Sequence, residues 1–600
     1  MALTGDAASK QEARSFFGLR AADVWALLAL LALAALSGYR AHLVNAAFGQ
    51  YTACPHCLDT TVWVDDAWLF AVLPVLLVLS QWLRNRPLRR LLALTVAIAV
   101  IAYGVDIVVF RLLTQRLLWI DVLHFAGDGA AMFSVFRPLL TRWQGWVLLL
   151  TILIAAFAAA AAIISAANSR RRMLFWSVIA ALAVAAGWLF PPLPYINMQA
   201  YQNLWQVNHE IDPGRAYSTE FHRQTLAQPP PALQCETGRA QKTSVVLVVV
   251  ESLSAYHSKL FSGLNDDTPQ LDQLARGGSY FSHFYANGYS TEGGLISLLT
   301  GYVPIPTAGS FGTTMAFTQT QGDFHRWLRG QGYQTAFFTS GLITLGNRGG
   351  WLQKLGIEHA EGSEQPFYAG MPQGAFDAPE DGALVERFLQ WHAHERRPGP
   401  FMATVLTVGT HPPFLLANSG RMDETASVRE VDRQLAHLAS VLAARGFFRD
   451  GLLLIVGDHR AMTPIRPAEQ RVLGASASAH VVALALGRTG LPLGESPQHL
   501  QQTDLIPSLR YLIGDRACRN DWQGLFFGGP PQPAKYVVHT DPMRRNEVSV
   551  LAGDSDYRLL LDGDATHWRQ APADSAEADR LRTQVNRERM SRMVEFGYRP

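Results

Sequence analysis

The apolar positions of the chain are concentrated before residue 191. They form five long segments, near residues 23–38, 67–82, 91–113, 146–167 and 173–190. Each segment is about long enough to cross the ~30 Å hydrocarbon core of a bilayer. The first segment follows a polar, basic amino terminus, as the apolar part of a signal peptide does. Because four more apolar segments come after it, it is better interpreted as the first membrane span. The pattern therefore predicts a membrane domain of five helices over residues 22–190, preceded by a cytoplasmic amino terminus at residues 1–21.

Basic residues between these segments indicate their orientation. Lys and Arg cluster in the amino terminus, between residues 84 and 90, and at residues 170–172. Five spans put all three clusters on one side, and basic loops remain in the cytoplasm. We therefore expect a multi-pass membrane protein with a cytoplasmic amino terminus and everything after residue 190 on the outer side of the membrane.

The pattern changes after a linker at residues 191–242, which contains PPLP and QPPPAL. Short apolar strands now alternate with amphipathic helices, and the strand candidates are residues 243–250, 333–340, 401–408, 452–458 and 480–487. This alternation predicts a mostly parallel sheet covered by helices on both faces, over residues 243–529. Weaker alternation and a charged helix at 574–594 predict a smaller antiparallel part over residues 530–600.

Charge and cysteine content narrow the possible partners. Residues 1–190 carry fifteen Lys and Arg against nine Asp and Glu, while residues 191–600 carry 36 against 40. The second part has no basic stripe, so we expect no nucleic-acid partner.

Four cysteines are too few for a disulfide framework. Cys54 and Cys57 form a CPHC element in an outer loop, where a disulfide could persist, and Cys235 and Cys518 could pair with each other.

Two features of the membrane part go beyond anchoring. The connection at residues 114–145 mixes Trp, Phe and Leu with Arg and Asp, which is typical of a segment in the headgroup layer. It could present a lipid or serve as an interfacial spacer. Asp106 lies inside the third segment, where a carboxylate is costly and is a functional candidate.

The candidate chemistry lies where two apolar strands end. Glu251 follows the strand at 243–250, and Asp458 and His459 follow the strand at 452–458. Ligands of open α/β sheets collect beyond the carboxyl ends of the strands, so we expect these side chains to share one crevice and bind a divalent cation. Between them, ANGYSTEGGLISLLTG places the Thr291 hydroxyl at a helix start, where it could act as a nucleophile or simply cap the helix.

Several motifs together carry a family resemblance. They are VVLVVVESLSA, ANGYSTEGGLISLLTG, TLGNRGGW, LTVGTHPPF, LLLIVGDHR and TDLIPSLRYLIG. In order and spacing they resemble the lipoteichoic acid synthase and phosphoglycerol transferase family, within the sulfatase-type branch of the alkaline phosphatase superfamily. The resemblance covers nearly the whole chain and is strongest over 243–514. It implies a five-helix transmembrane domain in a bacterial cytoplasmic (inner) membrane, followed by a periplasmic or extracellular, alkaline-phosphatase-like α/β domain.

The resemblance also assigns roles to individual residues. It implies that one divalent cation is bound by four residues, Glu251, Thr291, Asp458 and His459, with Thr291 also the nucleophile. Arg348, in GNRGG, matches the arginine that binds the glycerol phosphate, and a guanidinium suits phosphate because it donates two parallel hydrogen bonds. His411, in GTHPPF, matches the histidine near the substrate phosphate and could protonate the departing oxygen.

Two positions depart from the family pattern. Gly346 stands two residues before Arg348, where family members often have an aromatic residue. Stacking against the glycerol moiety is therefore in doubt. Arg460 follows His459 where glycine is common, and it would add a positive charge beside the metal. Neither change touches a predicted ligand.

The implied reaction has two steps. Thr291 attacks the phosphorus of phosphatidylglycerol or a related anionic phospholipid, diacylglycerol leaves, and the phosphoglycerol group passes to a glycan, lipid or polymer acceptor. Three oxygen ligands and one imidazole favour Mn²⁺, with Zn²⁺ or Mg²⁺ as alternatives. Phosphoethanolamine transfer, phosphodiester hydrolysis and a non-catalytic lipid-binding role are the alternative functions. Sulfate-ester hydrolysis is disfavoured, because STEGG lacks the C/S-x-P-x-R setting of sulfatases.

Overall fold

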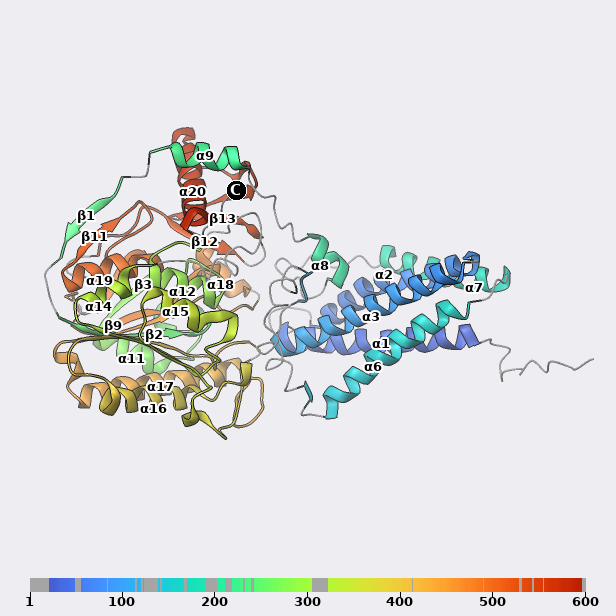
Figure 1. Cartoon of the computed structure of the whole chain (residues 1–600), viewed down its shortest axis with the longest axis horizontal. Coiled ribbons are helices and arrows are strands. Elements are labelled where there is room, and N and C mark those ends of the chain that lie inside the picture. Colours follow the sequence, from blue (N-terminus) through green and yellow to red (C-terminus); the bar gives the residue numbers. More distant parts are fainter. Residues whose placement is uncertain are drawn as a thin grey trace, which may run out of the picture. The chain divides into compact units, whose positions relative to one another are not determined.

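The computed structural model of the 600-residue chain has two compact units (Figure 1). One comprises Met1–Arg111, Gln115–Leu117 and Leu139–Val207, and the other comprises Leu112–Thr114, Leu118–Pro138 and Asn208–Pro600. The structure describes residues 21–48, 55–83, 85–113, 116–119, 122, 139–140, 143–166, 170–189, 202–210, 218–229, 232–238, 242–304, 322–412, 414–463, 465–488, 490–527, 531–541, 544–553 and 555–595.

The first unit is helical. Its long helices are α1 (Ala21–Phe48), α2 (Pro55–Trp82), α3 (Arg86–Leu113), α6 (Trp143–Ile164) and α7 (Arg170–Leu189). Among the described residues, four stretches are long and apolar enough to cross a membrane: Ala21–Ala46, Asp59–Trp82, Arg86–Leu112 and Trp143–Ile164. In α7 only the shorter stretch Met173–Leu182 is apolar by the same measure. Four of the five predicted spans are thus confirmed by length and composition, and the fifth stays a prediction.

Asp106, the candidate carboxylate of the third span, is buried in an ion pair. Its two oxygens accept hydrogen bonds from Arg116, from Nε at 3.0 Å and from Nη2 at 2.7 Å. Asp66 of α2 is similarly paired with Arg40 of α1 at 2.6 Å, and it also accepts a hydrogen bond from Tyr103. A buried charge of this kind is tolerated when it is paired. The ion pair with Arg116 therefore explains how the Asp106 carboxylate is tolerated inside the helical unit.

Two predicted features of this region fall largely outside the described residues. They are the interfacial segment at 114–145 and the CPHC element, of which Cys54 and the side chain of Cys57 are not described. Within the predicted linker, the described residues include α8 (Leu204–Glu210), α9 (Thr219–Ala227) and β1 (Gln234–Thr237).

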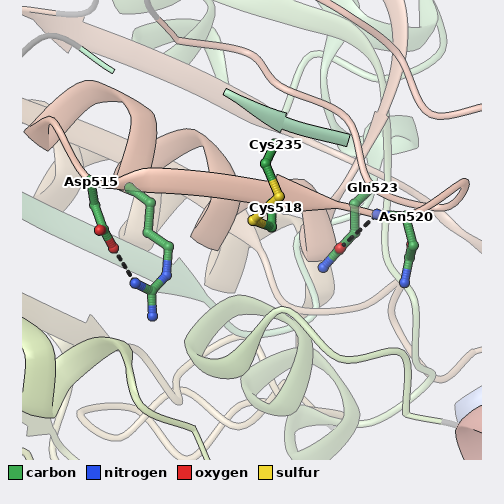
Figure 2. Close-up of a disulfide and its surroundings, with 6 residues drawn as sticks. Cys235, Asp515, Cys518, Asn520 and Gln523 are labelled. Carbon is green, nitrogen blue, oxygen red and sulfur yellow. Dashed lines mark hydrogen bonds and ion pairs between the residues drawn. A yellow bond between two sulfur atoms is a disulfide. The ribbon is translucent and has the colours of Figure 1, made fainter. Parts of the chain in front are cut away.

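β1 pairs in antiparallel fashion with β11 (Arg516–Arg519). A disulfide joins Cys235 of β1 to Cys518 of β11 across 283 residues of sequence (Figure 2).

A nine-stranded mixed sheet forms the centre of the second unit. Its order is β10-β3-β9-β7-β2-β6-β4-β5, with β8 paired to β3. The strands are β2 (Ser244–Val250), β3 (Ser279–Tyr285), β4 (Gln334–Thr339), β5 (His359–Glu361), β6 (Phe401–Leu406), β7 (Gly451–Gly457), β8 (His480–Val481), β9 (Ala483–Gly487) and β10 (Gly494–Gln501). The pairs on either side of β2 are parallel, whereas β8 and β9 run antiparallel to their neighbours. The predicted α/β sheet is confirmed, with a mixed region around β9.

Helices cover both faces of this sheet, as Figure 1 shows. One face packs against α11 (Pro269–Gly277), α16 (Asp381–Gln390) and α17 (Glu424–Ala444); the other packs against α12 (Thr291–Thr300), α14 (Phe324–Gly330), α15 (Arg348–Leu355) and α19 (Leu505–Ile513). Alternate residues of β2 enter the two cores: Val246 and Val248 face the first set of helices, and Val245 and Leu247 face the second. A strand buried on both faces has no polar positions, which explains its continuous apolar run.

The carboxyl-terminal part is a four-stranded antiparallel sheet. Its strands β12 (Val537–Asp541), β13 (Arg544–Ala552), β14 (Ser555–Asp562) and β15 (Ala565–Gln570) lie in sequence order. The helix α20 (Ser575–Glu595) packs Leu581 and Val585 onto this sheet. The shorter helices α10 (Lys259–Ser262) and α18 (Pro467–Leu473) complete the unit. The predicted antiparallel addition and its closing helix are therefore both present.

Candidate active site

The site lies at the carboxyl ends of β2 and β7, which are adjacent parallel strands. Their register pairs Val250 with Gly457, so the next residues, Glu251 and Asp458, emerge side by side. The Asp458 amide continues the ladder by donating to the Val250 carbonyl at 3.2 Å. Residues separated by more than 200 positions are thus brought together by the pairing of two apolar strands.

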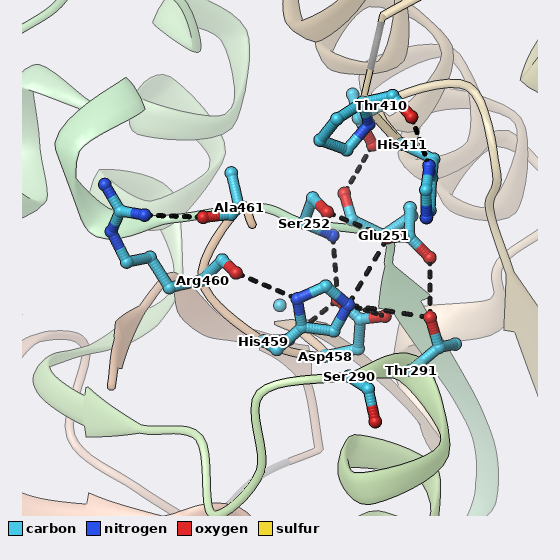
Figure 3. A network of polar contacts seen from close by, with 12 residues as sticks. Glu251, Ser252, Ser290, Thr291, Thr410, His411, Asp458, His459, Arg460 and Ala461 are labelled. Atoms are coloured by element: carbon cyan, nitrogen blue, oxygen red, sulfur yellow. Dashed lines mark hydrogen bonds and ion pairs between the residues drawn. The ribbon is translucent and has the colours of Figure 1, made fainter. Parts of the chain in front are cut away.

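Four side chains converge at this point (Figure 3). Candidate ligand atoms of Glu251, Asp458 and His459 lie within 4.8 Å of one another, and all three residues are buried. Thr291 donates a hydrogen bond from Oγ1 to Glu251 Oε2 at 3.0 Å, and the same oxygen lies 3.5 Å from His459 Nε2. The structure therefore places the four predicted metal ligands in one cluster.

Neighbouring groups fix the orientation of His459 and Asp458. The Arg460 carbonyl accepts the hydrogen of His459 Nδ1 at 2.8 Å, so Nε2 is the ring nitrogen that faces the cluster. Asp458 Oδ1 accepts hydrogen bonds from the amides of Ser252 and His459. Its other oxygen, Oδ2, is buried without a hydrogen-bond partner. A buried carboxylate oxygen without a partner is the arrangement that a bound cation would complete.

The electrostatics of the cluster also fit a cation. Burial and the neighbouring Glu251 raise the pKa of Asp458. Burial alone would lower the pKa of His459, but the carboxylates of Asp458 and Glu251 outweigh it and raise the pKa to about 9. The metal-free site therefore retains protons that a divalent cation would displace, because metal ligands bind in their deprotonated forms. The oxygen and imidazole donor set suits a divalent transition metal.

Thr291 is the first residue of α12 and is not its cap. The cap is Ser290, whose hydroxyl accepts the Gly293 amide. The Thr291 hydroxyl is thus free of the capping role that the sequence left open and points to Glu251 instead. The helix approaches the strand end closely, since a Cβ at Gly294 would lie 2.4 Å from the Asp458 carbonyl oxygen.

Arg348 and His411 are the two other predicted site residues. Arg348 begins α15; it is buried, and its Nε has no hydrogen-bond partner. Burial lowers its pKa, opposed by the negative charges of Glu292 and Glu251. His411 is drawn beside Glu251 in Figure 3, and its Nδ1 donates to the Pro412 carbonyl. Burial lowers the pKa of His411, so its neutral form, with a lone pair on Nε2, is favoured.

The expectation that Arg460 adds charge beside the metal is wrong. Its guanidinium points away from the cluster in Figure 3 and makes two 2.7 Å hydrogen bonds to buried Glu469. The charge is therefore neutralised by an ion pair with Glu469, and the Arg460 carbonyl contacts the site through His459 Nδ1.

Sequence analysis did not identify the groups that support these side chains. The hydroxyl of Thr410 donates to the Glu251 carbonyl, and the hydroxyl of Thr407 accepts the Glu251 amide. Ser252 donates to Glu251 Oε1 at 2.8 Å. Such contacts depend on how loops meet in space, and a single Ser or Thr has no spacing that would reveal them.

Comparison with known proteins finds one family model and several similar solved structures. Residues 243–509 match the family model described as Sulfatase. Similar solved structures include a protein in the alkaline phosphatase superfamily from Vibrio parahaemolyticus, at 19% identity over 62% of this chain and 94% of that chain, with a TM-score of 0.48. Another is the lipoteichoic acid synthase LtaP from Listeria monocytogenes, at 16% identity over 64% of this chain and 98% of that chain, with a TM-score of 0.45. A third is the C-terminal periplasmic domain of EcEptC from Escherichia coli, at 17% identity over 55% of this chain and 97% of that chain, with a TM-score of 0.37. The family match lies within the α/β part of the chain, which is therefore similar to the Sulfatase family over residues 243–509.

Proposed function

We propose that this protein is a membrane-bound, metal-dependent phosphoglycerol transferase. It would move glycerol phosphate from phosphatidylglycerol, or a related anionic phospholipid, to a hydroxyl of an envelope glycan, lipid or polymer. The observation that carries this proposal is the Thr291 hydroxyl, held between Glu251 and His459 at the start of α12. A hydroxyl in this position is placed to attack phosphorus, because exposed helix amides favour the phosphate oxygens.

The cation would be held by Glu251, Thr291, Asp458 and His459, with Mn²⁺ favoured over Zn²⁺ or Mg²⁺. When bound, it would stabilise negative charge on the hydroxyl oxygen and on the phosphate. The protein residues orient the nucleophile and the imidazole. Glu251 Oε2 accepts the hydrogen bond of the Thr291 hydroxyl, and the Arg460 carbonyl accepts the Nδ1 hydrogen of His459 and so fixes its tautomer. Attack by Thr291 would release diacylglycerol and leave the phosphoglycerol group esterified to this residue.

His411 is suited to proton transfer at the alcohol oxygens. Its Nδ1 hydrogen is held by the Pro412 carbonyl, so Nε2 is the atom that can take or give a proton. In the second step the neutral ring would accept the proton of the entering hydroxyl. In the first step its protonated form would give a proton to the departing diacylglycerol oxygen.

Arg348 would bind the transferred group. A buried guanidinium with a free Nε–H is a strong donor to phosphate, and its cost of burial is offset when an anion is bound. Chemistry at phosphorus is favoured over sulfate-ester hydrolysis because the nucleophile is a threonine followed by Glu292 and Gly293, without the proline and arginine of the sulfatase pattern.

The disulfide and the apolar helices support the proposed location. A disulfide such as Cys235–Cys518 persists in an oxidising compartment, outside the bacterial cytoplasm. Helices long enough to cross a membrane would hold the enzyme where its lipid donor resides. Together they support a catalytic domain on the outer side of a cytoplasmic membrane.

The test is diacylglycerol release by the full-length protein in vesicles of labelled phosphatidylglycerol with Mn²⁺. We expect release by the wild type and loss of release in Thr291→Ala. Ser290→Ala is the matched control, since it removes the adjacent hydroxyl and the helix cap, at a cost of about 1 kcal/mol, but keeps Thr291. Equal release by the wild type and Thr291→Ala would refute the role of Thr291.

Three further measurements distinguish the alternatives. Release from phosphatidylethanolamine in preference to phosphatidylglycerol would favour phosphoethanolamine transfer, and formation of free glycerol phosphate without any acceptor product would favour hydrolysis. Failure of the purified protein to bind Mn²⁺ or Zn²⁺ would favour a non-catalytic lipid-binding role.

A further inference from the structure

Backbone strain in the second unit is concentrated around the predicted site. Among the described residues, four that are not glycine have positive φ: Ser252, Asn347, Phe376 and Phe414. Side chains other than glycine adopt this conformation only when their surroundings hold them there, and such positions gather at functional sites. Ser252 follows Glu251, Asn347 precedes Arg348, and Phe414 comes three residues after His411. Phe376 is distant in sequence from every predicted site residue.

Phe376 nevertheless contacts the site. Its ring meets the His411 imidazole edge to face, with centroids 4.6 Å apart and an interplanar angle of 87°. Phe376 is only partly buried, so part of the residue is accessible to solvent. Its φ of 54° lies in a short loop that is closed by hydrogen bonds, from the Gly374 amide to the Ala378 carbonyl at 2.8 Å and from the Ala378 amide to the Ala375 carbonyl.

The loop is also fastened to its surroundings. A Cβ at Gly374 would lie 2.7 Å from the Leu415 carbonyl oxygen, so the backbone of this loop is in close contact with the segment that follows His411. That segment is itself held by Phe414, whose amide donates to the His411 carbonyl at 2.8 Å. The position of the Phe376 ring is therefore determined by two interlocked loops. A residue serving only as core filling would not need a strained backbone at a partly exposed position.

We propose that Phe376 is a specificity-determining residue, an aromatic wall that favours an alcohol over water on the His411 side of the site. This inference rests on the proposed transfer reaction. In an in-line displacement the leaving alcohol and the entering alcohol both lie opposite the Thr291 oxygen. In the proposed reaction His411 gives a proton to the first and takes a proton from the second. The ring offers apolar surface to the carbon skeleton of that alcohol, and a water molecule cannot use it. No aromatic residue stands at Gly346, so this wall comes from a different loop.

The step in question is resolution of the Thr291 ester. The oxygen of the alcohol or of water bonds to phosphorus while the bond from phosphorus to Thr291 Oγ1 breaks. The attacking oxygen loses its proton to His411 Nε2, and the Thr291 oxygen takes back the proton held at Glu251 Oε2. Alcohol and water compete for the same ester, so their product ratio measures selection between them and does not depend on how much active enzyme is present.

The experiment uses the full-length protein with Mn²⁺, bis(p-nitrophenyl) phosphate as donor and glycerol as the alcohol. Loss of p-nitrophenolate needs no protonation, so formation of the Thr291 ester is separated from the later step. The ratio of p-nitrophenyl phosphate to glyceryl p-nitrophenyl phosphate is then measured by mass spectrometry. Phe376→Ala should raise this ratio by about tenfold, while Phe376→Tyr, which keeps the ring, should retain the wild-type ratio. Phe376→Gly removes the ring and accommodates the positive φ, so it should match Phe376→Ala even if alanine disturbs the loop.

Three outcomes would overturn the proposal. An unchanged ratio in both Phe376→Ala and Phe376→Gly would show that the ring does not select the alcohol. Loss of p-nitrophenolate release in both variants would give the ring a part in the first step instead. If the wild type releases p-nitrophenolate but forms no glycerol product at any glycerol concentration, the proposed transfer itself fails; that result is visible without any Phe376 variant.

Discussion

Replacing Asp458 by asparagine should stabilise the metal-free protein while abolishing its response to metal. In the folded chain, burial and the neighbouring Glu251 raise the pKa of Asp458 from 3.8 to about 8. Folding between these pH values therefore requires the carboxylate to take up a proton. The cost is absent below about pH 4, grows by about 1.4 kcal/mol per pH unit, and reaches about 4 kcal/mol at pH 7.

Asparagine avoids this cost and preserves the local hydrogen bonds. Its Oδ1 can accept the amides of Ser252 and His459, which donate to Asp458 Oδ1 at 2.8 Å and 2.7 Å. Its Nδ2 replaces an oxygen that has no hydrogen-bond partner and lies 3.4 Å from His459 Nε2. We therefore expect Asp458→Asn to be more stable than the wild type without metal, by an amount on the order of 1–3 kcal/mol at pH 7 and by less at pH 5. The gain is smaller than the full cost because asparagine also removes the negative charge that stabilises protonated His459.

The assay is unfolding of the full-length protein in detergent at pH 5, 6 and 7, with EDTA or with Mn²⁺. Metal should stabilise the wild type, because it binds the folded state, and should not stabilise Asp458→Asn. Asp504→Asn is the matched control, since burial also raises the pKa of Asp504, to about 7, but Asp504 is not among the predicted ligands. It should keep the response to metal. An Asp458→Asn variant that is less stable than the wild type in EDTA, or an advantage that does not grow with pH, would refute the reasoning.

Three other predictions concern the ion pair of Arg460, the disulfide and the membrane topology. Arg460→Ala should cost about 3–5 kcal/mol of stability in thermal unfolding, because it leaves the buried carboxylate of Glu469 unpaired, whereas the double variant with Glu469→Ala should cost less. Replacing Cys235 and Cys518 by serine, or reducing their disulfide, should lower the free energy of unfolding by about 5 kcal/mol, since the bond closes a loop of 283 residues; an unchanged unfolding temperature would contradict this. A reporter that is active only outside the cytoplasm, fused after residue 195, should be active if α7 completes a fifth span. Inactivity would indicate four spans and a catalytic domain on the same side as the amino terminus.

Local patterns in the sequence predicted much of the fold, because the elements concerned are specified by nearby residues. The continuous apolar run of β2 indicated a strand buried on both faces, and alternation with amphipathic helices indicated a largely parallel sheet. The edge strand β10 and its neighbour β3 were not predicted, since strands such as Gly494–Gln501 mix polar and apolar residues and gain their structure by pairing with a neighbour. The antiparallel direction of β9 was also not predicted, because direction depends on how the chain returns to the sheet.

For the site, the sequence by itself determined which chemical groups end the two central strands. Glu251, Asp458 and His459 follow apolar runs whose burial is dictated by composition, so their convergence could be anticipated from the rules of parallel sheets. The tertiary structure alone decided the rest: that Ser290 caps α12 and frees Thr291, that Glu469 neutralises Arg460, and that the ring of Phe376 meets His411. The physical reason is that strand burial follows from local hydrophobicity, whereas ion pairs, tautomers and ring contacts depend on where separate loops meet in space.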